Sequence, residues 1–298
     1  MQKTKKPVTG RPGLWIFGEV LFDTFPDGTA VLGGAPFNVA WNLTAFGADP
    51  KIISAVGDDP PGREIQARMD RWRMNRDHVA ICPEYPTGKV TVNLSRGEPS
   101  YIIEEQQAYD NIPLHCLPEQ TDDFLYFGSL ALRSTHNQEV LAELRKRHQG
   151  KVFVDINLRE PFWTEAGVSE LLDDVHWLKL NENELAQLNR ENEAEAAARQ
   201  LKHDYSLEGI VVTCGSKGAF TLGPENRLIR VEPHQAQEVR DTVGAGDAFA
   251  SVLLLGLLRS WTLEETLTRA QDFAAAVIGL QGAVSTAPDF YQQHLQTW

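Results

Sequence analysis

The stretch Asp241-Thr242-Val243-Gly244-Ala245-Gly246-Asp247 stands directly before an apolar segment, residues 248–258, that predicts a helix. At the start of a helix, free backbone N–H groups point out of the helix and the helix dipole makes the place positive. Glycine residues there allow an anion to approach the backbone closely. The stretch therefore predicts either a structural turn or a site for a phosphate group that is being transferred.

Asp247 ends this stretch and falls in the first turn of the expected helix. A carboxylate there stabilises a helix by typically ~0.3–1 kcal/mol, so a purely structural role is one reading. The other is a general base, which takes the proton from a hydroxyl that attacks a phosphate. A Walker loop is absent, because Gly88-Lys89 and Gly150-Lys151 are each followed by valine instead of serine or threonine.

A second glycine pair lies near the N-terminus, in Gly33-Gly34-Ala35-Pro36-Phe37-Asn38-Val39-Ala40. Pro36 suits the first turn of a helix, and the glycines permit a ligand or another backbone segment to come close. The Asn38 amide offers donors and an acceptor one turn further on, which suits a polyol. Upstream, Gly18-Glu19 ends an apolar run and Asp23 follows, and open α/β sheets bind ligands at such strand ends.

Short apolar runs recur along the chain, and helical patterns separate many of them. Val39, Leu43 and Phe46 mark one helix that ends at Gly47, and Glu182–Gln200 reads as one or two helices. Strands that alternate with helices imply βαβ units and a mostly parallel sheet, so the expected fold class is α/β. The expected buried strands are Leu14–Phe17, Lys51–Val56, Phe124–Phe127, Val152–Ile156, Trp177–Leu180 and Ile210–Thr213.

One region departs from this pattern. Val90, Val92 and Leu94 alternate with polar residues, which is the period of a strand with one wet face. A turn at Arg96-Gly97-Glu98-Pro99 and a second run at Ser100–Glu104 predict a hairpin. Its apolar face would cover a ligand or a partner subunit, unless the hairpin is an ordinary sheet edge.

The composition is that of a globular protein: 298 residues, of which 42% are hydrophobic and 23% charged. The net charge of −13 disfavours non-specific binding to nucleic acid or to an anionic membrane. The longest mostly apolar stretch, Ala250–Leu258, is shorter than the ~20 residues of a membrane-spanning helix.

Three cysteines, Cys82, Cys116 and Cys214, form no metal-binding pattern and fit a reducing compartment. Met1–Pro12 carries basic residues but lacks the apolar core of a signal peptide. We therefore expect a loose basic tail and a cytoplasmic protein.

Together these motifs resemble those of the ribokinase/pfkB family of sugar kinases. Asp241–Asp247 matches the family's second signature, usually DTxGAGD, at every fixed position, and Gly33–Ala40 resembles the GGAPxNVA form typical of its fructokinases. Gly57–Arg63 matches the family's GxDxxG region. The resemblance runs in order and spacing from about Trp15 to Pro288.

The resemblance implies a three-layer ribokinase-like fold, in which helices flank a central, mainly parallel sheet and a small β-sheet lid covers the sugar. The chain would comprise a loose tail, residues 1–12, and a single domain, residues 13–298, with a lid formed by about 20–32 and 85–112. A lid excludes water, which competes with the sugar as phosphoryl acceptor. In relatives two lids often pack together, so a homodimer through the lid is also implied.

The resemblance also implies catalytic and sugar-binding residues. Asp247 matches the catalytic base, and it matches a sugar contact as well. Arg159, in the D-x-N-x-R stretch 155–159, would meet the sugar or the transferred phosphate, and an internal ion pair with Asp155 or Glu160 is the alternative. The anion hole that stabilises transition-state charge is matched by Gly244, Ala245 and Gly246. The other sugar contacts are matched by Asp23, Gly33, Gly34 and Asn38.

For ATP and its cations, the resemblance points to other residues. Asn181-Glu182-Asn183-Glu184 matches the NxxE motif associated with Mg²⁺, and a solvated helix start is the alternative. Glu184 would act through water, because Mg²⁺ sheds its hydration reluctantly. Asp241 resembles the side chain beside a monovalent-cation site, for which K⁺ is a candidate. The implied nucleotide-binding residues are Asn181, Thr213, Gly215, Gly218, Gly244, Gly246 and Gly282.

The expected reaction is transfer of the ATP γ-phosphate to D-fructose, giving fructose 6-phosphate, because Pro86–Val92 and Ala108–Asp110 resemble fructokinases more than ribokinases. A kinase for 2-keto-3-deoxygluconate, another sugar or a nucleoside is an alternative. A further alternative is a catalytically silent sugar-binding regulator. Such a regulator should have lost the base, the glycines or the metal motif, and all of these are present.

Overall fold

A nine-stranded sheet forms the centre of the computed structural model, which describes residues 13–95, 98–233 and 239–298. The expected tail, residues 1–12, and Arg96-Gly97 of the expected turn lie outside the described residues. From β5 to β11 every neighbouring pair of strands is parallel, and β12 and β13 complete the sheet antiparallel. The strand order is β13-β12-β11-β10-β9-β8-β1-β4-β5.

The strands of this sheet are short and almost entirely buried at its centre. The six strands expected from apolar runs are all confirmed, within one or two residues at their ends. The bounds are β1 (Leu14–Phe17), β4 (Pro50–Gly57), β5 (Val79–Cys82), β8 (Phe124–Gly128), β9 (Val152–Asp155), β10 (Trp177–Asn181), β11 (Gly209–Thr213), β12 (Ala219–Leu222) and β13 (Leu228–Val231).

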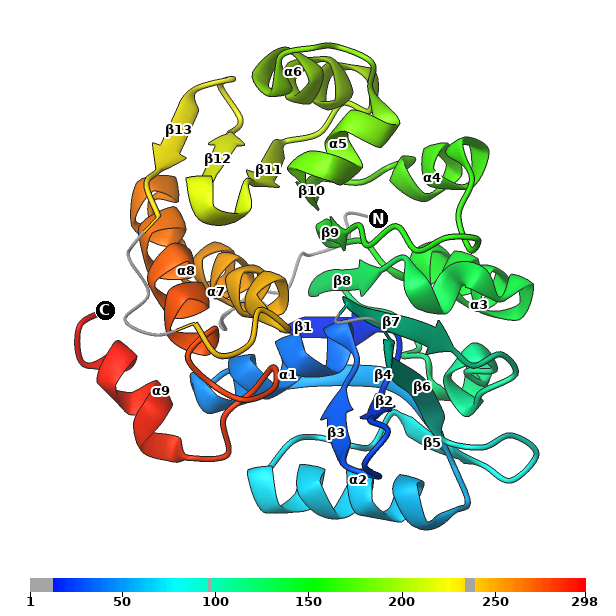
Figure 1. The fold of residues 1–298 in the computed structure, drawn as a ribbon. Coiled ribbons are helices and arrows are strands. Elements are labelled where there is room, and N and C mark those ends of the chain that lie inside the picture. Colours follow the sequence, from blue (N-terminus) through cyan, green and yellow to red (C-terminus); the bar gives the residue numbers. More distant parts are fainter. Residues whose placement is uncertain (1–12, 96–97, 234–238) are drawn as a thin grey trace, which may run out of the picture.

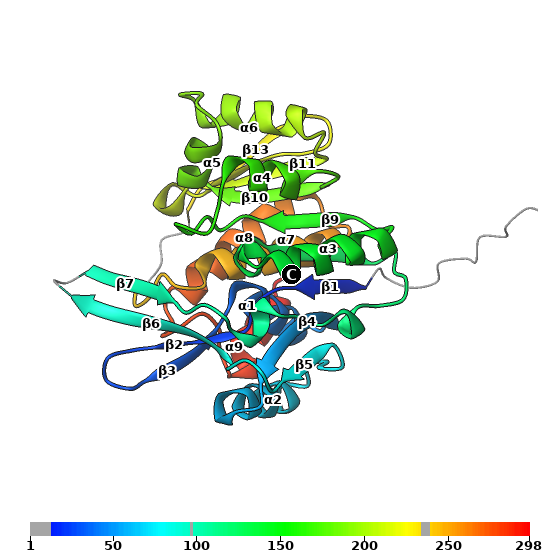
Figure 2. The same ribbon diagram turned by 90° about the vertical axis from the view of Figure 1, so that its right-hand side faces the viewer.

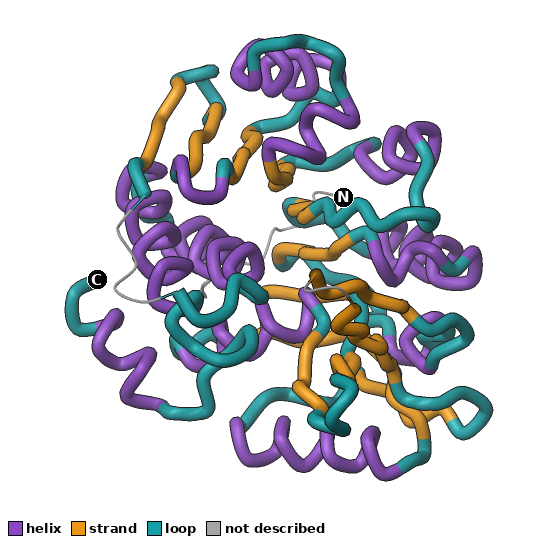
Figure 3. The backbone as a smooth tube through the Cα atoms, in the orientation of Figure 1, coloured by secondary structure: helices purple, strands orange, loops and turns teal. Residues whose placement is uncertain are grey.

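Helices cover both faces of the sheet, so the strands need apolar side chains on both sides. In β1, Leu14 and Ile16 join one core cluster and Trp15 and Phe17 join the other, because successive side chains of a strand point to opposite faces. Figures 1 and 3 show α1, α7 and α8 on one side of the sheet and α3, α4 and α5 on the other. The confirmed architecture is therefore the expected three-layer α/β fold.

The helices begin and end as local chemistry predicts. Pro36 stands in the first turn of α1, and Gly47 follows its end with φ +77°. The segment Glu182–Gln200 divides into two helices, α5 and α6. The bounds are α1 (Ala35–Ala45), α2 (Pro60–Trp72), α3 (Thr135–Arg147), α4 (Glu165–Leu172), α5 (Glu182–Leu188), α6 (Ala194–Asp204), α7 (Ala245–Arg259), α8 (Leu263–Val277) and α9 (Pro288–Leu295).

A second sheet of four strands, β3-β2-β6-β7, projects from the main body (Figure 2). The expected hairpin is confirmed as β6 (Gly88–Ser95) and β7 (Glu98–Ile103), which pair antiparallel. It joins a second hairpin, β2 (Leu21–Thr24) and β3 (Ala30–Gly33), through the parallel pair β2–β6. Towards the body, this sheet packs Leu21 and Val90 on the buried ring of Tyr109.

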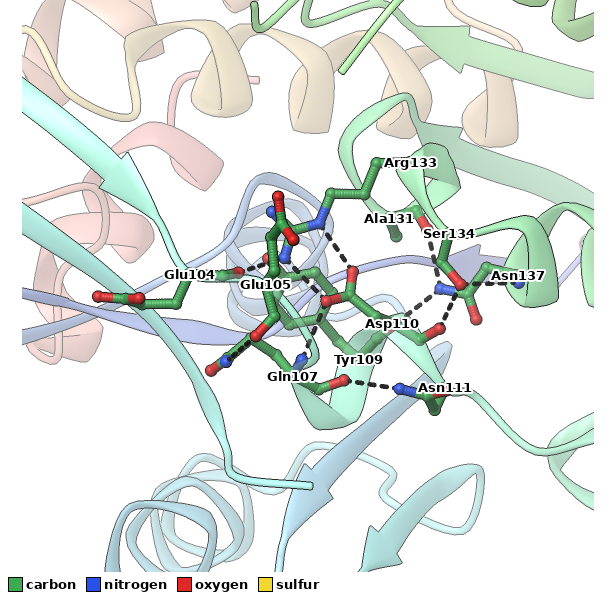
Figure 4. Close-up of polar contacts among 10 residues, drawn as sticks. All are labelled: Glu104, Glu105, Gln107, Tyr109, Asp110, Asn111, Ala131, Arg133, Ser134 and Asn137. Carbon is green, nitrogen blue, oxygen red and sulfur yellow. Dashed lines mark hydrogen bonds and ion pairs between the residues drawn. The ribbon is translucent and has the colours of Figure 1, made fainter. Parts of the chain in front are cut away.

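A buried polar joint connects β7 to the main body (Figure 4). Arg133, at the end of the 3-10 helix Leu130–Arg133, donates two hydrogen bonds to the Asp110 carboxylate, at 2.9 and 2.8 Å. The same guanidinium donates to the carbonyl of Glu104, which directly follows β7. Charge-assisted, bidentate bonds of this kind fix orientation strongly, so the joint sets how the small sheet stands over the body.

No helix among the described residues combines the length and the apolar content that crossing a lipid bilayer requires.

Candidate active site

A cleft of about 970 Å³ lies between the carboxyl ends of the central strands and the small sheet. Glu19 after β1, Asp155 at the end of β9 and Asn181 at the end of β10 line it from the main sheet. Leu21 and Val90 line it from the small sheet. A parallel sheet brings the carboxyl ends of its strands to one edge, so polar residues that are distant along the chain meet here.

The start of α7 forms one wall of this cleft through Gly244, Gly246 and Asp247. Gly244 adopts the left-handed conformation, with φ +80°, and a Cβ there would lie 2.3 Å from the Cβ of Ala283. Only glycine fits both the conformation and the space. Gly244 and Gly246 therefore bring the backbone at the start of α7 to the wall of the cleft.

Asp247 and Asn38 meet at this wall although 209 residues separate them along the chain. The amide Nδ2 of Asn38 donates a hydrogen bond of 2.7 Å to Oδ2 of Asp247. Burial raises the pKa of Asp247, while the Asn38 hydrogen bond and the charges of Lys179 and Arg159 lower it. The Asp247 side chain is thus oriented by a neutral donor, which leaves its second oxygen for another partner.

A buried ion pair that the sequence interpretation missed lies next to Gly246 at the start of α7. Lys179 Nζ is 2.7 Å from Oδ1 of Asp155, and both side chains are 7% exposed. Burial raises the pKa of Asp155 to about 6 in spite of Lys179. Lys179 Nζ also lies 3.6 Å from where a Cβ of Gly246 would be, so a positive charge stands close behind the glycine backbone. A lone lysine in the apolar run Trp177–Leu180 was the signal in the sequence.

Arg159 lines the cleft and makes no ion pair with any described residue. No ion pair of Arg159 with Asp155 or Glu160 is present among the described residues, and Asp155 pairs with Lys179 instead. Arg159 nevertheless lowers the pKa of Asp23 and of Asp247, so its charge acts within the cleft.

Three further residues of the expected sugar site lie together at the N-terminus of α1. Asp23 lines the cleft, and its pKa is raised to about 6, chiefly by burial and then by the charges of Asp247 and Asp241. Gly34 lines the cleft as the residue before α1. Gly33 does not line it but lies against Asp23, since a Cβ there would stand 3.0 Å from Oδ2 of Asp23.

Glu19 is a second residue to which the sequence interpretation assigned no role. It lines the cleft, is only 3% exposed, and its Oε2 has no hydrogen-bond partner among the described residues. Burial raises its pKa to about 7, and the charge of Asp247 contributes to the shift. The signal in the sequence was its place at the end of the first apolar run.

Asn181 and Glu184 form a capping box at the start of α5. The Asn181 side chain accepts from the N–H of Glu184, and Oε2 of Glu184 accepts from the N–H of Asn181 at 2.8 Å. Oε1 of Glu184 accepts from the N–H of Leu158 at 3.1 Å. Both residues line the cleft, so the motif is a helix start that also faces the site.

A metal ion would not find a complete set of protein ligands here. Among the described residues, no three His, Cys, Asp or Glu side chains are grouped to hold one. Mg²⁺ usually keeps several waters and binds one or two carboxylates together with substrate phosphates. The Glu184 carboxylate fits that mode, because each of its oxygens has a lone pair beyond the backbone hydrogen bond that it accepts.

The residues expected around the nucleotide divide into two groups. Asn181, Thr213, Gly244 and Gly246 line the cleft, whereas Gly215, Gly218 and Gly282 do not. Gly218 has a structural reason to be glycine, since a Cβ there would lie 2.0 Å from the carbonyl oxygen of Val231.

Asp241 and Gly282 lie behind the cleft and contact each other. Oδ2 of Asp241 accepts from the N–H of Gly282 at 3.2 Å, and Oδ1 accepts from the N–H of Val243 at 3.0 Å. Ala245 also lies outside the cleft lining, although its neighbours Gly244 and Gly246 line it. Asp241 therefore ties the loop after α8 to the glycine-rich start of α7.

The fold and the cleft together define a class of protein: an α/β protein whose cleft, at the carboxyl ends of the strands, is lined by glycines and a carboxylate at the start of one helix. A family model described as pfkB family carbohydrate kinase matches residues 17–289. The chain therefore belongs to the pfkB family of carbohydrate kinases, as its motifs indicated, and it is an ATP-dependent sugar phosphotransferase.

The similar proteins are named as kinases, and their names give different acceptors. A fructokinase of Salmonella typhimurium is 27% identical, over 95% of this chain and 97% of its own. An aminoimidazole riboside kinase of the same species is 26% identical, over 92% of each. A fructokinase of Vibrio cholerae, solved with fructose, ADP and a calcium ion, has a TM-score of 0.80 and 27% identity, over 95% of this chain and 98% of its own.

Proposed function

We propose that the protein transfers the γ-phosphate of ATP to D-fructose and releases fructose 6-phosphate. The observation that carries the proposal is the 2.7 Å hydrogen bond between Asn38 and Asp247 at the anion site, in the same cleft as Asp23 and Arg159. Two relatives named fructokinase, 27 and 28% identical, support fructose as the acceptor. Another relative, 26% identical, is named aminoimidazole riboside kinase, so the identity of the acceptor has to be tested directly.

In the proposed reaction Asp247 acts as the general base. Asn38 holds one oxygen of the carboxylate, and the other accepts the proton from the attacking hydroxyl. The raised pKa of Asp247 places the carboxyl closer to the working pH, which favours proton transfer in both directions. Because a general base works in its ionised form, turnover should fall at acidic pH.

The transferred phosphate would lie at the start of α7. Backbone N–H groups of Gly244, Ala245 and Gly246 would meet its oxygens, with the helix dipole behind them. Arg159 has no partner among the described residues and is free to bind the phosphate with two parallel hydrogen bonds. Lys179, paired with Asp155, adds positive charge behind the same glycines.

The acceptor end of the cleft is suited to a neutral polyol. Asp23 and Asn38 would bind hydroxyl groups, and Gly33 and Gly34 leave room for them. Among the described residues that line the cleft, the cations are Arg159 and Lys179, both assigned here to the phosphate. A carboxylate-bearing acceptor such as 2-keto-3-deoxygluconate would face acids and find no free cation.

ATP would bind along the carboxyl ends of β10 and β11. Asn181 and Thr213 line the cleft there, and Gly215 and Gly218 shape the loop after β11, while Gly282 borders the α7 start. Glu184 would hold Mg²⁺ through water, and the ion, when bound with ATP, neutralises charge on the phosphates. Asp241 would lie beside a K⁺ ion, as a Vibrio cholerae fructokinase double mutant was solved with fructose, ADP and potassium.

The small sheet would act as a lid and as a dimer interface. It stands over the cleft on the joint of Arg133 and Asp110, so closing it would exclude water from the phosphate. Tyr101 and Ile102 both line the cleft, and they point to opposite faces of β7 because they are adjacent in the strand. Ile102 is 52% exposed and is the apolar side chain on β7 that a second copy would cover. The three unpaired cysteines and the net charge of −13 support a cytoplasmic enzyme that binds neither nucleic acid nor membranes.

A coupled assay of ADP release across a panel of acceptors tests this function. The panel contains D-fructose, D-ribose, 2-keto-3-deoxygluconate and aminoimidazole riboside. We expect the highest kcat/KM for D-fructose, and phosphorus NMR of the product should show phosphate on O6. A higher kcat/KM for another acceptor would replace fructose, and sugar binding without ADP release would indicate the silent regulator.

A further inference from the structure

Glu19 is a buried carboxyl that has no role in the proposed phosphate transfer. It is the second residue after β1, lines the cleft and is 3% exposed. Its Oε2 has no hydrogen-bond partner among the described residues. Leaving a buried polar atom unpaired is costly, so a protein that keeps such a group is expected to pair it when a ligand is bound.

The position of Glu19 is tied closely to the acceptor end of the cleft. A Cβ at Gly34 would lie 2.6 Å from the carbonyl oxygen of Glu19, so the N-terminus of α1 rests on this residue. The N–H of Ala35 lowers the pKa of the Glu19 carboxyl, and the charge of Asp247 raises it. Glu19 therefore stands beside the group that would activate the acceptor hydroxyl.

Asn38 provides an independent observation at the same place. Its Nδ2 donates to Asp247, but its Oδ1 is buried and has no partner among the described residues. Glu19 and Asn38 thus present two oxygens without partners among the described residues, in the same cleft as Asp247. Two unpaired acceptors need two donors, and a molecule with several hydroxyl groups supplies more than one.

The N–H of Ala35 gives the Glu19 carboxyl a contact with the start of α1, but a purely structural role would leave Oε2 without a partner among the described residues. A structural buried carboxylate is normally paired with a cation. The Asp155 carboxylate has Lys179 at 2.7 Å and the Asp110 carboxylate has Arg133 at 2.8 Å. Glu19 has no ion pair with any residue that the structure describes, although it faces the same cleft as Asp155.

We propose that Glu19 is a specificity-determining residue whose carboxyl binds a second hydroxyl of the acceptor sugar, next to the hydroxyl that Asp247 activates. This inference rests on the proposed sugar kinase function. It concerns a different hydroxyl from the one that reacts, so its loss weakens binding and orientation while the base and the anion site stay in place.

A double-mutant cycle between the protein and the sugar tests the proposal. Glu19→Ala should raise KM for D-fructose about 10- to 100-fold, the usual effect of losing a hydrogen bond to a charged group, with a smaller change in kcat. The same kinetics are then measured with 1-deoxy-, 3-deoxy- and 4-deoxy-D-fructose. For the analogue that lacks the bound hydroxyl, wild type and Glu19→Ala should have similar KM, so that the two losses do not add.

Two further variants separate binding from folding. Glu19→Gln keeps the shape and one acceptor oxygen, so its KM should rise less than that of Glu19→Ala, and it serves the cycle if the alanine variant fails to fold. Ser54→Ala removes another buried, unpartnered side-chain oxygen, on β4 and outside the cleft lining, and should leave KM unchanged.

The outcomes distinguish the two proposals. An unchanged KM in Glu19→Ala, or losses that add for every deoxy analogue, would overturn the role of Glu19 while leaving the kinase function in place. If wild type releases no ADP with any sugar of the panel, the proposed function itself is wrong, and the Glu19 inference is overturned with it.

Discussion

Asp247 lies in the first turn of α7, where a carboxylate either stabilises the helix or acts as a base, and a single substitution separates these roles. Asp247→Asn should lower kcat by roughly 10²–10⁴, the usual range for a general base, because an amide cannot take the proton. Binding of D-fructose, measured by calorimetry, should persist, since the Asn38 contact is the only hydrogen bond of the side chain among described residues.

Asp289→Asn is the matched control, because Asp289 stands in the first turn of α9 and does not line the cleft. It should lose at most ~1 kcal/mol of stability, the helix-dipole contribution, and keep wild-type turnover. Near-normal turnover in Asp247→Asn would assign that residue the structural role instead.

The raised pKa of Glu19 predicts how the stability of the protein changes with pH. Its pKa in the folded protein is about 7, against 4.5 ordinarily, so the folded state binds this proton more tightly than the unfolded chain. Stability from this group therefore falls as pH rises from about 5 to above 7. Glu19→Gln has no proton to lose, so relative to wild type it should gain stability over that range, by at most about 3 kcal/mol.

Thermal unfolding of both proteins at pH 5 and pH 8 measures this difference. His148 and His294, whose pKa values are lowered by burial, change stability in the opposite direction with pH, but they are common to both proteins and cancel. A constant difference between wild type and Glu19→Gln would show that Glu19 ionises normally in the folded protein. A variant that is more stable at pH 8 yet binds sugar less well would be typical of a functional site.

At the scale of secondary-structure elements, the start of α7 depends on Gly244. Gly244→Ala should lower kcat by about 10²-fold or more, because the added methyl group meets Ala283 at 2.3 Å and displaces the N–H groups of the anion site. Gly47→Ala is the matched control, with φ +77° against +80° but no atom within 4 Å of the added Cβ.

In both variants alanine has to adopt a left-handed backbone conformation, which should lower the free energy of unfolding by about 1–2 kcal/mol. Denaturant unfolding measures this loss. Only Gly244→Ala should lose turnover. If both variants lose turnover to the same degree, the effect is one of general stability, and the assignment of the α7 start as the anion site would fail.

At the scale of the whole molecule, the small sheet is the element that a partner would cover. Ile102→Lys should shift the protein from dimer to monomer in analytical ultracentrifugation, because it places a charge in the proposed apolar interface. Ile81→Lys is the control, since Ile81 is exposed to a similar extent, 56% against 52%, but lies on β5 at the edge of the main sheet.

A dimer that survives Ile102→Lys but not Ile81→Lys would move the interface to the edge of the main sheet. A protein that is monomeric before any substitution would leave the small sheet as a lid alone. In either case the Arg133–Asp110 joint of Figure 4 still fixes how that sheet stands over the cleft.

Local chemistry made much of the fold predictable from the sequence. Continuous apolar runs identified six central strands, the alternation of Val90 and Val92 identified the hairpin of the small sheet, and Gly47 marked the end of α1. These signals are local, because a strand covered on both faces or a helix end requires particular residue types within a few positions. The two glycine-rich stretches identified the family for the same reason.

Only the tertiary structure decided which side chains meet. Asn38 reaches Asp247 across 209 residues, and Lys179 pairs with Asp155, so that Arg159 stays available for a ligand. It also decided that Glu19 is buried and that its Oε2 has no hydrogen-bond partner among the described residues. Burial and pairing depend on elements that come together only when the sheet forms, and no pattern along the chain encodes the environment that moves the pKa of a carboxyl from 4.5 to about 7.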